Sequence, residues 1–164
     1  MITMQELQNK IGGVFYFATV EDGEPRVRPF GFTMVFENKL YFGCGTHKAA
    51  YAQLMKDPHL EVCAFNNGTF VRVRGKAVMD DRDEVQEAMY QSAPFLEKTY
   101  NTQTGYHHIC FYMEDMSAME FKGPEAIRLV YPLSGYRTQI SFYAACIYGR
   151  RIFAHEMYSY LPFR

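Results

Sequence analysis

The chain has no tryptophan, few cysteines and no long apolar segment. Its four cysteines, Cys44, Cys63, Cys110 and Cys146, lie far apart and form no Cys-x-x-Cys pair, which disfavours a zinc site or a thioredoxin-like redox pair. No apolar run approaches the ~20 residues that a membrane-spanning helix needs. These absences favour a cytoplasmic protein that keeps its thiols reduced and has no membrane segment.

The sequence also lacks an excess of charge of either sign. It has 17 Lys and Arg residues against 18 Asp and Glu residues, a formal net charge of −1. Nucleic-acid-binding domains usually carry a clustered basic excess, so we expect no nucleic-acid partner. Any anion that binds must be held by local groups, because no global field attracts it. Residues 1–10 are polar and helix-like, so we expect no signal peptide there.

Aromatic side chains, by contrast, are abundant. The 164 residues include 14 Phe and 13 Tyr, and 48% are hydrophobic, which is enough for a full core in a single domain. Aromatic rings and β-branched side chains pack well on the pleated surface of a sheet. The composition therefore favours a strand-rich fold.

Local patterns predict six strands and three helices with short connections. Thr3 and Glu6 have the spacing of a capping box, and turn signals such as Asn66-Asn67-Gly68 separate the extended runs. The expected strands are residues 14–20, 26–36, 40–44, 60–65, 69–79 and 107–121, and the expected helices are residues 3–11, 47–56 and 80–92. Antiparallel hairpins joined by short helices predict a mainly β protein, with a barrel over residues 1–121 and an extension of uncertain structure over residues 122–164.

Two arginines follow the first predicted turn. Arg26 and Arg28 stand at positions i and i+2 of an expected strand, which places both on one face. Guanidinium groups suit phosphate because they stay charged and donate paired hydrogen bonds. Pro29 removes a ladder donor, so this segment lies at a sheet edge or a bulge. The alternative is a solvated polar face on an irregular edge strand.

A glycine-rich segment, Gly43-Cys44-Gly45-Thr46-His47-Lys48, joins a predicted strand to a predicted helix. A helix N-terminus offers unpaired N–H groups to an anion, and Thr46, His47 and Lys48 add a hydroxyl, a ring N–H and a charge. The alternative is that Thr46 only caps the helix. Strands 26–36 and 40–44 are expected to be hairpin neighbours, so the arginines and the helix start are predicted to converge on one phosphate.

The spacing within helix 47–56 predicts which of its side chains are buried. Tyr51, Leu54 and Met55 fall on one helical face, so we expect that face to pack on the barrel.

Taken together, these motifs resemble the pyridoxamine 5′-phosphate oxidase-like FMN-binding split barrels, and especially the small members related to nitroimidazole reductases. The resemblance covers roughly residues 3–121. It rests on Phe15-Tyr16-Phe17-Ala18-Thr19-Val20, Pro25-Arg26-Val27-Arg28-Pro29-Phe30-Gly31-Phe32, Leu40-Tyr41-Phe42, Thr46-His47-Lys48, Asp57-Pro58 and Val71-Arg72-Val73-Arg74-Gly75.

The resemblance implies a six-stranded antiparallel split barrel that forms a homodimer and binds FMN non-covalently at the dimer interface. It implies that the helix start and one or both arginines hold the phosphate, while the backbone of Val27 and Pro29 lines the ring. The cofactor-binding residues expected on this basis are Arg26, Val27, Arg28, Pro29, Phe42, Gly43, Thr46, His47, Lys48 and Phe70.

The chain departs from the family's oxidases at three places. It has Thr46-His47-Lys48 where they usually have Ser-Arg-Lys, so His47 replaces an arginine. Phe70 replaces a glutamine that bonds the ring there, and phenylalanine offers only stacking. The oxidases also end in a Trp- and Arg-containing segment that binds pyridoxal phosphate, and this chain has no such segment. Vitamin B6 oxidation is therefore not the expected activity.

The expected function is an FMN-dependent oxidoreductase that passes electrons from NAD(P)H to a small-molecule acceptor. Because the flavin carries the reaction, no side chain is expected to be catalytic, and no metal is expected. One alternative is a non-catalytic flavin- or haem-binding or storage module, in which His107 or His108 would ligate the haem iron. Adjacent strand residues face opposite sides, so these two histidines are not expected to share one metal. Another alternative is a scaffold whose flavin site has decayed.

Overall fold

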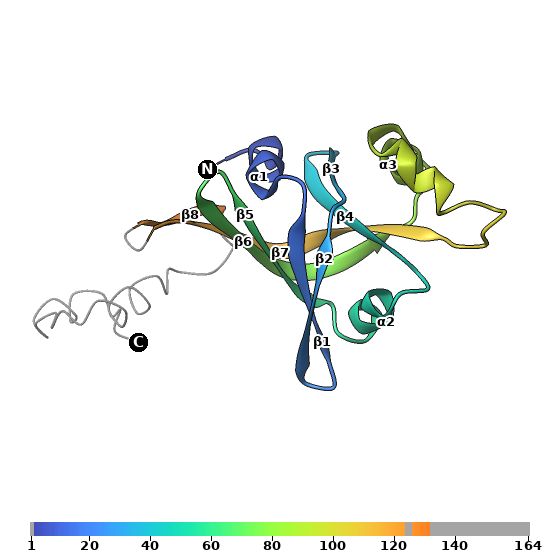
Figure 1. Ribbon diagram of the computed structural model, residues 1–164, viewed down its shortest axis with the longest axis horizontal. Coiled ribbons are helices and arrows are strands. Elements are labelled where there is room, and N and C mark those ends of the chain that lie inside the picture. The colour runs from blue at the N-terminus through green and yellow to red at the C-terminus, as the bar shows by residue number, and fades with distance from the viewer. Residues whose placement is uncertain (1, 124–125, 132–164) are drawn as a thin grey trace, which may run out of the picture. The chain divides into compact units, whose positions relative to one another are not determined.

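The computed structural model describes residues 2–123 and 126–131, and over this range it shows one antiparallel sheet with short helices (Figure 1). The mainly β prediction is confirmed. The elements are α1 (Met4–Ile11), β1 (Phe15–Glu21), β2 (Glu24–Phe30), β3 (Thr33–Phe36), β4 (Lys39–Gly45), α2 (Ala49–Lys56), β5 (His59–Asn66), β6 (Thr69–Asp80), α3 (Asp83–Ser92), the 3₁₀ helix η1 (Pro94–Lys98), β7 (His108–Lys122) and β8 (Ala126–Tyr131). Among the described helices, none is long and apolar enough to cross a membrane.

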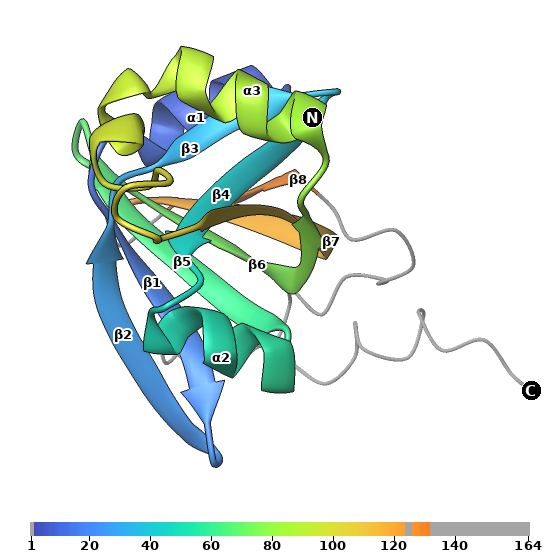
Figure 2. The same cartoon turned by 90° about the vertical axis from the view of Figure 1, so that its right-hand side faces the viewer.

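The sheet follows the order β2-β1-β5-β6-β7-β4-β3, and β8 pairs with β7. Every pair is antiparallel. The two ends of this order, β2 and β3, are consecutive in the chain, and the sheet between them curves strongly (Figure 2). The curved sheet gives β1 to β7 a common interior.

Tight turns set the register of the hairpins. Asp22-Gly23 joins β1 to β2, and Asn67-Gly68 joins β5 to β6, with positive φ at all four residues. Two-residue turns of this kind match the right-handed twist of the flanking strands. Both hairpins expected from these turn signals are confirmed by the pairing of β1 with β2 and of β5 with β6.

The single strand expected over residues 26–36 is wrong, because the chain forms two strands there. β2 pairs with β1 up to Phe30, and β3 starts at Thr33 and pairs with β4. Pro29 cannot donate a hydrogen bond to a neighbouring strand, and Gly31, two residues later, has no side chain to pack on a sheet. The chain therefore leaves one strand partner and joins another. The predicted hairpin with strand 40–44 is confirmed for residues 33–36, which pair with β4 as β3, but it is wrong for the part that carries the arginines, which pairs with β1 as β2.

The C-terminal part of the described chain adds a further strand. β7 runs to Lys122 and is followed by β8, so the described residues form eight strands rather than the six expected. Residues 132–164, most of the expected extension, lie outside the described residues. The domain boundary after residue 121 and the homodimer stay predictions.

Helix α1 begins with the predicted capping box. Thr3 Oγ1 accepts from Glu6 N–H at 3.1 Å, and Thr3 N–H donates to Glu6 Oε2 at 2.6 Å. These two bonds satisfy two backbone donors at the helix start. The buried face of α1 consists of Met4, Leu7 and Ile11.

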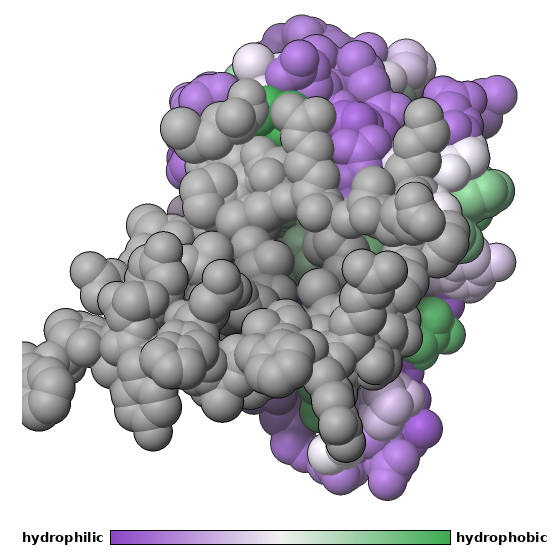
Figure 3. Space-filling view, turned by 90° about the vertical axis from the view of Figure 1, so that its left-hand side faces the viewer, coloured by the Kyte–Doolittle hydropathy of each residue, from purple (hydrophilic) through white to green (hydrophobic). Residues whose placement is uncertain are grey.

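Two apolar clusters fill the fold and lie on opposite faces of β4 and β7. The interior cluster contains the rings of Phe15, Phe17, Phe42 and Phe111. The second cluster contains Tyr41 and joins β3, β4 and β7 to α3 and η1. On the face that Figure 3 shows, the visible described residues are mainly hydrophilic, and hydrophobic ones form small separate spots.

Candidate functional site

The candidate site is built around the start of helix α2. Lys48 is the N-cap residue, its side chain makes no capping hydrogen bond, and the first turn of the helix holds no acidic residue. The first amides of a helix have no intrahelical acceptor and carry a partial positive charge. Among the described residues Lys48 is exposed and forms no ion pair. This helix start is therefore suited to an anion.

Thr46 and His47 tie this helix start to the segment before β7. The backbone N–H and the hydroxyl of Thr46 donate to His107 O, at 2.9 and 3.3 Å. The His47 ring stacks on Tyr106 with the ring centroids 4.2 Å apart. Thr46 precedes the N-cap residue Lys48, so the alternative role of Thr46 as the helix cap is wrong.

The two glycines of β4 make room for aromatic rings. A Cβ on Gly43 would lie 2.2 Å from His108 Cε1, and a Cβ on Gly45 would lie 2.6 Å from His47 Cε1 and 2.9 Å from Tyr100 Cε1. Neither glycine has a positive φ. Their role is thus to let three rings approach the strand closely, rather than to form a flexible phosphate loop.

His108 is a buried, neutral histidine. Its side chain is 3% exposed, and its ring lies 4.7 Å from that of Tyr100 and 5.6 Å from that of Phe32. Burial, together with the charge of Lys48, lowers the pKa of His108 to about 4. Its Nδ1 atom has no hydrogen-bond partner among the described residues. This enclosed ring presents no open position to a haem iron.

His107 directly precedes β7. It is exposed, and its Nε2 lies 2.9 Å from Asp81 Oδ1. His107 is thus paired with Asp81, whereas His108 Nδ1 has no partner among the described residues, and the haem-binding alternative stays a prediction.

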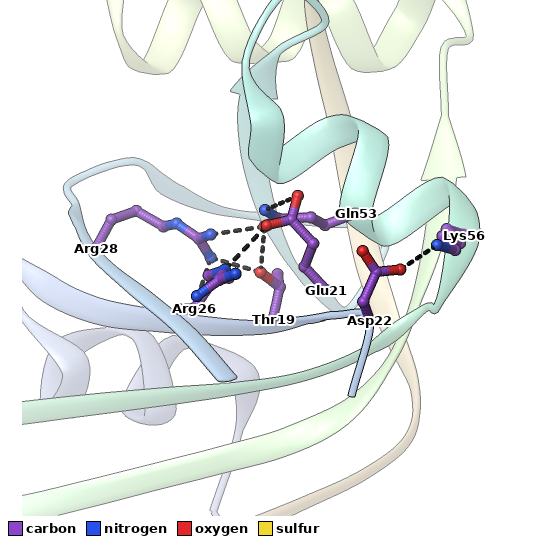
Figure 4. A network of polar contacts seen from close by, with 7 residues as sticks. All are labelled: Thr19, Glu21, Asp22, Arg26, Arg28, Gln53 and Lys56. Carbon is purple, nitrogen blue, oxygen red and sulfur yellow. Dashed lines mark hydrogen bonds and ion pairs between the residues drawn. The ribbon is translucent and has the colours of Figure 1, made fainter. Parts of the chain in front are cut away.

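Arg26 and Arg28 lie on the same face of β2, as predicted, and that face points toward α2 (Figure 4). Arg28 donates from Nη1 to Thr19 Oγ1 and from Nη2 to Gln53 Oε1, each at 2.6 Å. Arg26 Nε donates to Glu21 Oε2 at 2.9 Å. The arginines are thus part of a polar network that joins the β1–β2 hairpin to α2.

The charges of Arg28 and Lys48 both act on the buried thiol of Cys44, near the end of β4. Burial raises the pKa of Cys44 to about 11, and the charges of Lys48 and Arg28 act in the opposite direction. The structure therefore brings one arginine to helix α2, through its hydrogen bond to Gln53 at 2.6 Å and not through the hairpin expected. That the two hold one phosphate stays a prediction.

The other predicted site residues lie in different surroundings. Val27 and Pro29 are exposed on the face of β2 opposite the arginines. Phe42 is fully buried, with its ring centroid 5.7 Å from that of Phe15, so its side chain belongs to the core. Phe70 is 49% exposed, and its centroid lies 4.6 Å from that of Phe65.

Phe70 is not brought together with the helix start within this chain. It pairs with Phe121 near one end of β7, whereas Gly43 pairs with Cys110 near the other. A contact between Phe70 and a ligand at α2 of the same chain would have to span the length of β7.

Sequence reasoning missed Thr19 and Gln53. Both are buried, at 2% and 5% exposure, and they bond to each other at 2.6 Å. The helical spacing offered a signal for Gln53, which falls one residue before Leu54, but its polar side chain suggested solvent. The expected burial of Met55 is wrong, because Met55 is 60% exposed.

The sequence was compared with known families and proteins. Residues 9–119 match a family model described as pyridoxamine 5′-phosphate oxidase. A NimC/NimA family protein from Clostridium acetobutylicum has 30% sequence identity and a TM-score of 0.69, and the match covers 77% of this chain and 93% of that one. A search of curated proteins finds no match.

More distant solved structures share the fold. A pyridoxamine 5′-phosphate oxidase-related, FMN-binding protein from Nostoc punctiforme has 20% identity and a TM-score of 0.51, with 71% of this chain and 78% of that one covered. A haem-binding protein from Mycobacterium smegmatis has 15% identity and a TM-score of 0.58, with 79% and 58% covered. At these identities the likeness concerns the fold.

Proposed function

This chain belongs to the pyridoxamine 5′-phosphate oxidase family, and on that basis we propose that it binds FMN and acts as an FMN-dependent oxidoreductase. Its electron donor is a reduced nicotinamide and its acceptor a small molecule. The observation that carries this proposal is Lys48, which is exposed and has no ion-pair partner among the described residues, at the start of α2, where no side chain caps the helix.

The helix start fits a phosphate monoester. Unpaired amides, the helix dipole and an ammonium group together favour a dianion. Arg28 adds a second positive charge beside the helix, since its Nη2 donates to Gln53 of α2 at 2.6 Å. The phosphate of FMN is the group that this arrangement would hold.

The free edge of β2 fits the flavin ring. Proline is accommodated in a strand where its nitrogen faces away from the ladder, and alternate residues share that direction. The backbone groups of Pro25, Val27 and Pro29 therefore face the free edge. All three residues present a carbonyl oxygen there, and Val27 alone adds an N–H. A flavin ring carries both carbonyl oxygens and an N–H, so it can pair with such an edge.

The protein's contribution is binding and orientation. FMN, when bound, would supply the two-electron redox chemistry between the nicotinamide and the acceptor. Burial raises the pKa of Cys44 to about 11 and that of Cys110 to about 12. Both thiols stay protonated at neutral pH, so neither acts as a nucleophile.

We also propose that the protein is a homodimer, as the family resemblance implies. The outward face of the β1, β2, β5 and β6 region carries exposed apolar side chains, among them Tyr16, Val27 and Phe65 at 59%, 62% and 62% exposure. Side chains of this size are normally covered when they lie together on one sheet face. Sedimentation of the full chain should give twice the monomer mass, and a monomer at all concentrations would contradict the dimer.

The flavin proposal is tested by the visible spectrum and FMN affinity of the purified full chain. We compare Lys48→Met with Lys56→Met, the same change at the other end of α2, where the lysine pairs with Asp22 and is 70% exposed. Loss of a phosphate contact at Lys48 should weaken FMN binding by at least about tenfold. Lys56→Met should bind FMN as the wild type does.

Each outcome decides one part of the proposal. Wild-type protein that neither purifies with FMN nor takes it up overturns flavin binding, and a haem spectrum would do the same. Equal FMN affinity in Lys48→Met and wild type overturns the phosphate site. Anaerobic NADH or NADPH should bleach the bound flavin. If neither nicotinamide reduces the flavin, the protein is a flavin-binding module and not an oxidoreductase.

A further inference from the structure

The polar contacts between α2 and the β1–β2 hairpin close into a ring of three side chains. Arg28 Nη1 donates to Thr19 Oγ1, Thr19 Oγ1 donates to Gln53 Oε1, and Arg28 Nη2 donates to the same Gln53 oxygen, all at 2.6 Å (Figure 4). Nη1 also donates to Arg26 O at 2.9 Å. Both terminal nitrogens of Arg28 are therefore used inside the protein.

The other two members of the ring are sealed from solvent. Thr19 is 2% and Gln53 is 5% exposed. Gln53 Nε2 donates to Glu21 Oε1 at 3.1 Å, so both ends of its amide are held. A buried amide with both ends bonded has one favourable orientation, since turning it would leave donors and acceptors unpaired.

Gln53 and Lys48 belong to one short helix segment. Lys48 is the N-cap of α2, and Gln53 lies in the second half of its eight residues. A helix of this length behaves as a rigid rod held by its backbone bonds. Fixing Gln53 against the hairpin therefore also fixes Lys48 and the first amides of α2 relative to β2.

We propose that Arg28, Thr19 and Gln53 are positioning residues that set the start of α2 against β2. This inference rests on the proposed FMN site. It predicts that two residues with no access to the ligand, Thr19 and Gln53, control how strongly the site prefers FMN over riboflavin, which lacks the phosphate.

The experiment measures the affinity of the full chain for FMN and for riboflavin and takes the ratio. Gln53→Leu, Thr19→Val and Arg28→Lys should each lower the preference for FMN by at least about fivefold, the effect of one lost buried hydrogen bond. Thr19→Ser keeps the hydroxyl and should keep the preference. Lys56→Met removes only an exposed ion pair of α2 and should also keep it.

Three results would overturn the inference. If Arg28 binds phosphate directly through its charge, Arg28→Lys keeps much of the preference while Gln53→Leu and Thr19→Val leave it unchanged. If the ring is only structural, the melting temperature falls in all three variants with no change in the ratio. If Thr19→Ser behaves like Thr19→Val, the hydroxyl is not what matters.

A second measurement does not depend on flavin. In flavin-free protein, amide hydrogen exchange of α2 should accelerate in Gln53→Leu and Arg28→Lys, while exchange of α1 stays as in the wild type. Unchanged exchange of α2 would overturn the positioning role even if the wild type bound no flavin. A wild type that binds no flavin but shows this acceleration would instead refute only the proposed function.

Discussion

Two arginines each hold a short helix against a strand hairpin, and their partners differ in kind. Arg82, just before α3, donates to Asp80 Oδ1 at 2.9 Å and to Glu37 Oε2 at 2.8 Å. Arg28 reaches α2 through a hydroxyl and an amide. The first arginine is thus held by charged partners and the second by neutral ones.

This difference decides where positive charge remains. The Arg82 guanidinium lowers the pKa of both Asp80 and Glu37, so two carboxylates offset one cation beside α3. The direct partners of Arg28 carry no charge, and Lys48 has no carboxylate partner among the described residues. Glu21 acts on the charge of Arg28, so the uncompensated charge that an anion would find at α2 is that of Lys48.

The largest effect is expected from disturbing the strand that leads into α2. Gly43→Ala would put a Cβ 2.2 Å from the enclosed His108 ring, and such overpacking should lower the free energy of unfolding by about 3 kcal/mol. Gly13→Ala is the control, because nothing lies within 4 Å of its Cβ position. Denaturant titration compares the two, and equal midpoints would show that the ring moves aside freely.

The next largest effect is expected from acid, which should lower stability in a different pH range through His108 than through the carboxylates beside α3. The pKa of His108 is about 4 in the folded protein and about 6.5 in an unfolded chain. Between these values the unfolded chain binds more protons, so stability falls as the pH falls, by up to about 3 kcal/mol. His108→Leu should remove this slope in denaturation midpoints measured from pH 7 to pH 4.

The carboxylates beside α3 respond to acid in a lower range. Arg82 lowers the folded pKa of Asp80 and Glu37, so their contribution is present above the unfolded pKa of about 4 and is lost as the pH falls further. An unaltered slope above pH 4 in His108→Leu would mean that another group, and not His108, takes up the proton.

A smaller loss of stability is expected when the hydrogen-bonded ring of Arg28, Thr19 and Gln53 is broken. Arg28→Met removes charge-assisted hydrogen bonds to Thr19 and Gln53, and we expect unfolding to become easier by about 2 kcal/mol. High salt should leave this difference largely in place, because the partners are buried and neutral. A difference that disappears in salt would show that Arg28 acts through long-range charge instead.

The smallest effect is expected at Arg82. Its side chain and that of Glu37 are each 47% exposed, and exposed ion pairs contribute little. Arg82→Met should therefore shift the melting temperature less than Arg28→Met does, and the shift should shrink further in about 1 M salt. A larger shift than that of Arg28→Met would show that Arg82 contributes more to stability than Arg28 does.

The features predicted correctly from the sequence have their partners close by in the chain. The capping box joins Thr3 to Glu6, and the Asn67-Gly68 turn depends on its own two residues. In each case the residues that predict the feature are the same residues that form it. Capping and turn chemistry can therefore be read without knowing the fold.

The features that were missed depend on distant segments. The burial of Gln53 makes sense only once Thr19 and Arg28 lie beside α2, and these come from other strands. The role of Gly43 depends on the ring of His108 on β7. A polar residue in a helix and a glycine in a strand carry no sign of such partners in the sequence.

Strand β2 has a consequence for how copies of this protein behave when crowded. Among the described strands it pairs with β1 alone, so its other side is an open row of backbone groups. Such rows act as templates on which further chains add, the first step of fibre growth. Pro25 and Pro29 interrupt this row, because neither has an N–H to offer. The two prolines thus make the edge a poor template for pairing with the strand of a neighbouring chain.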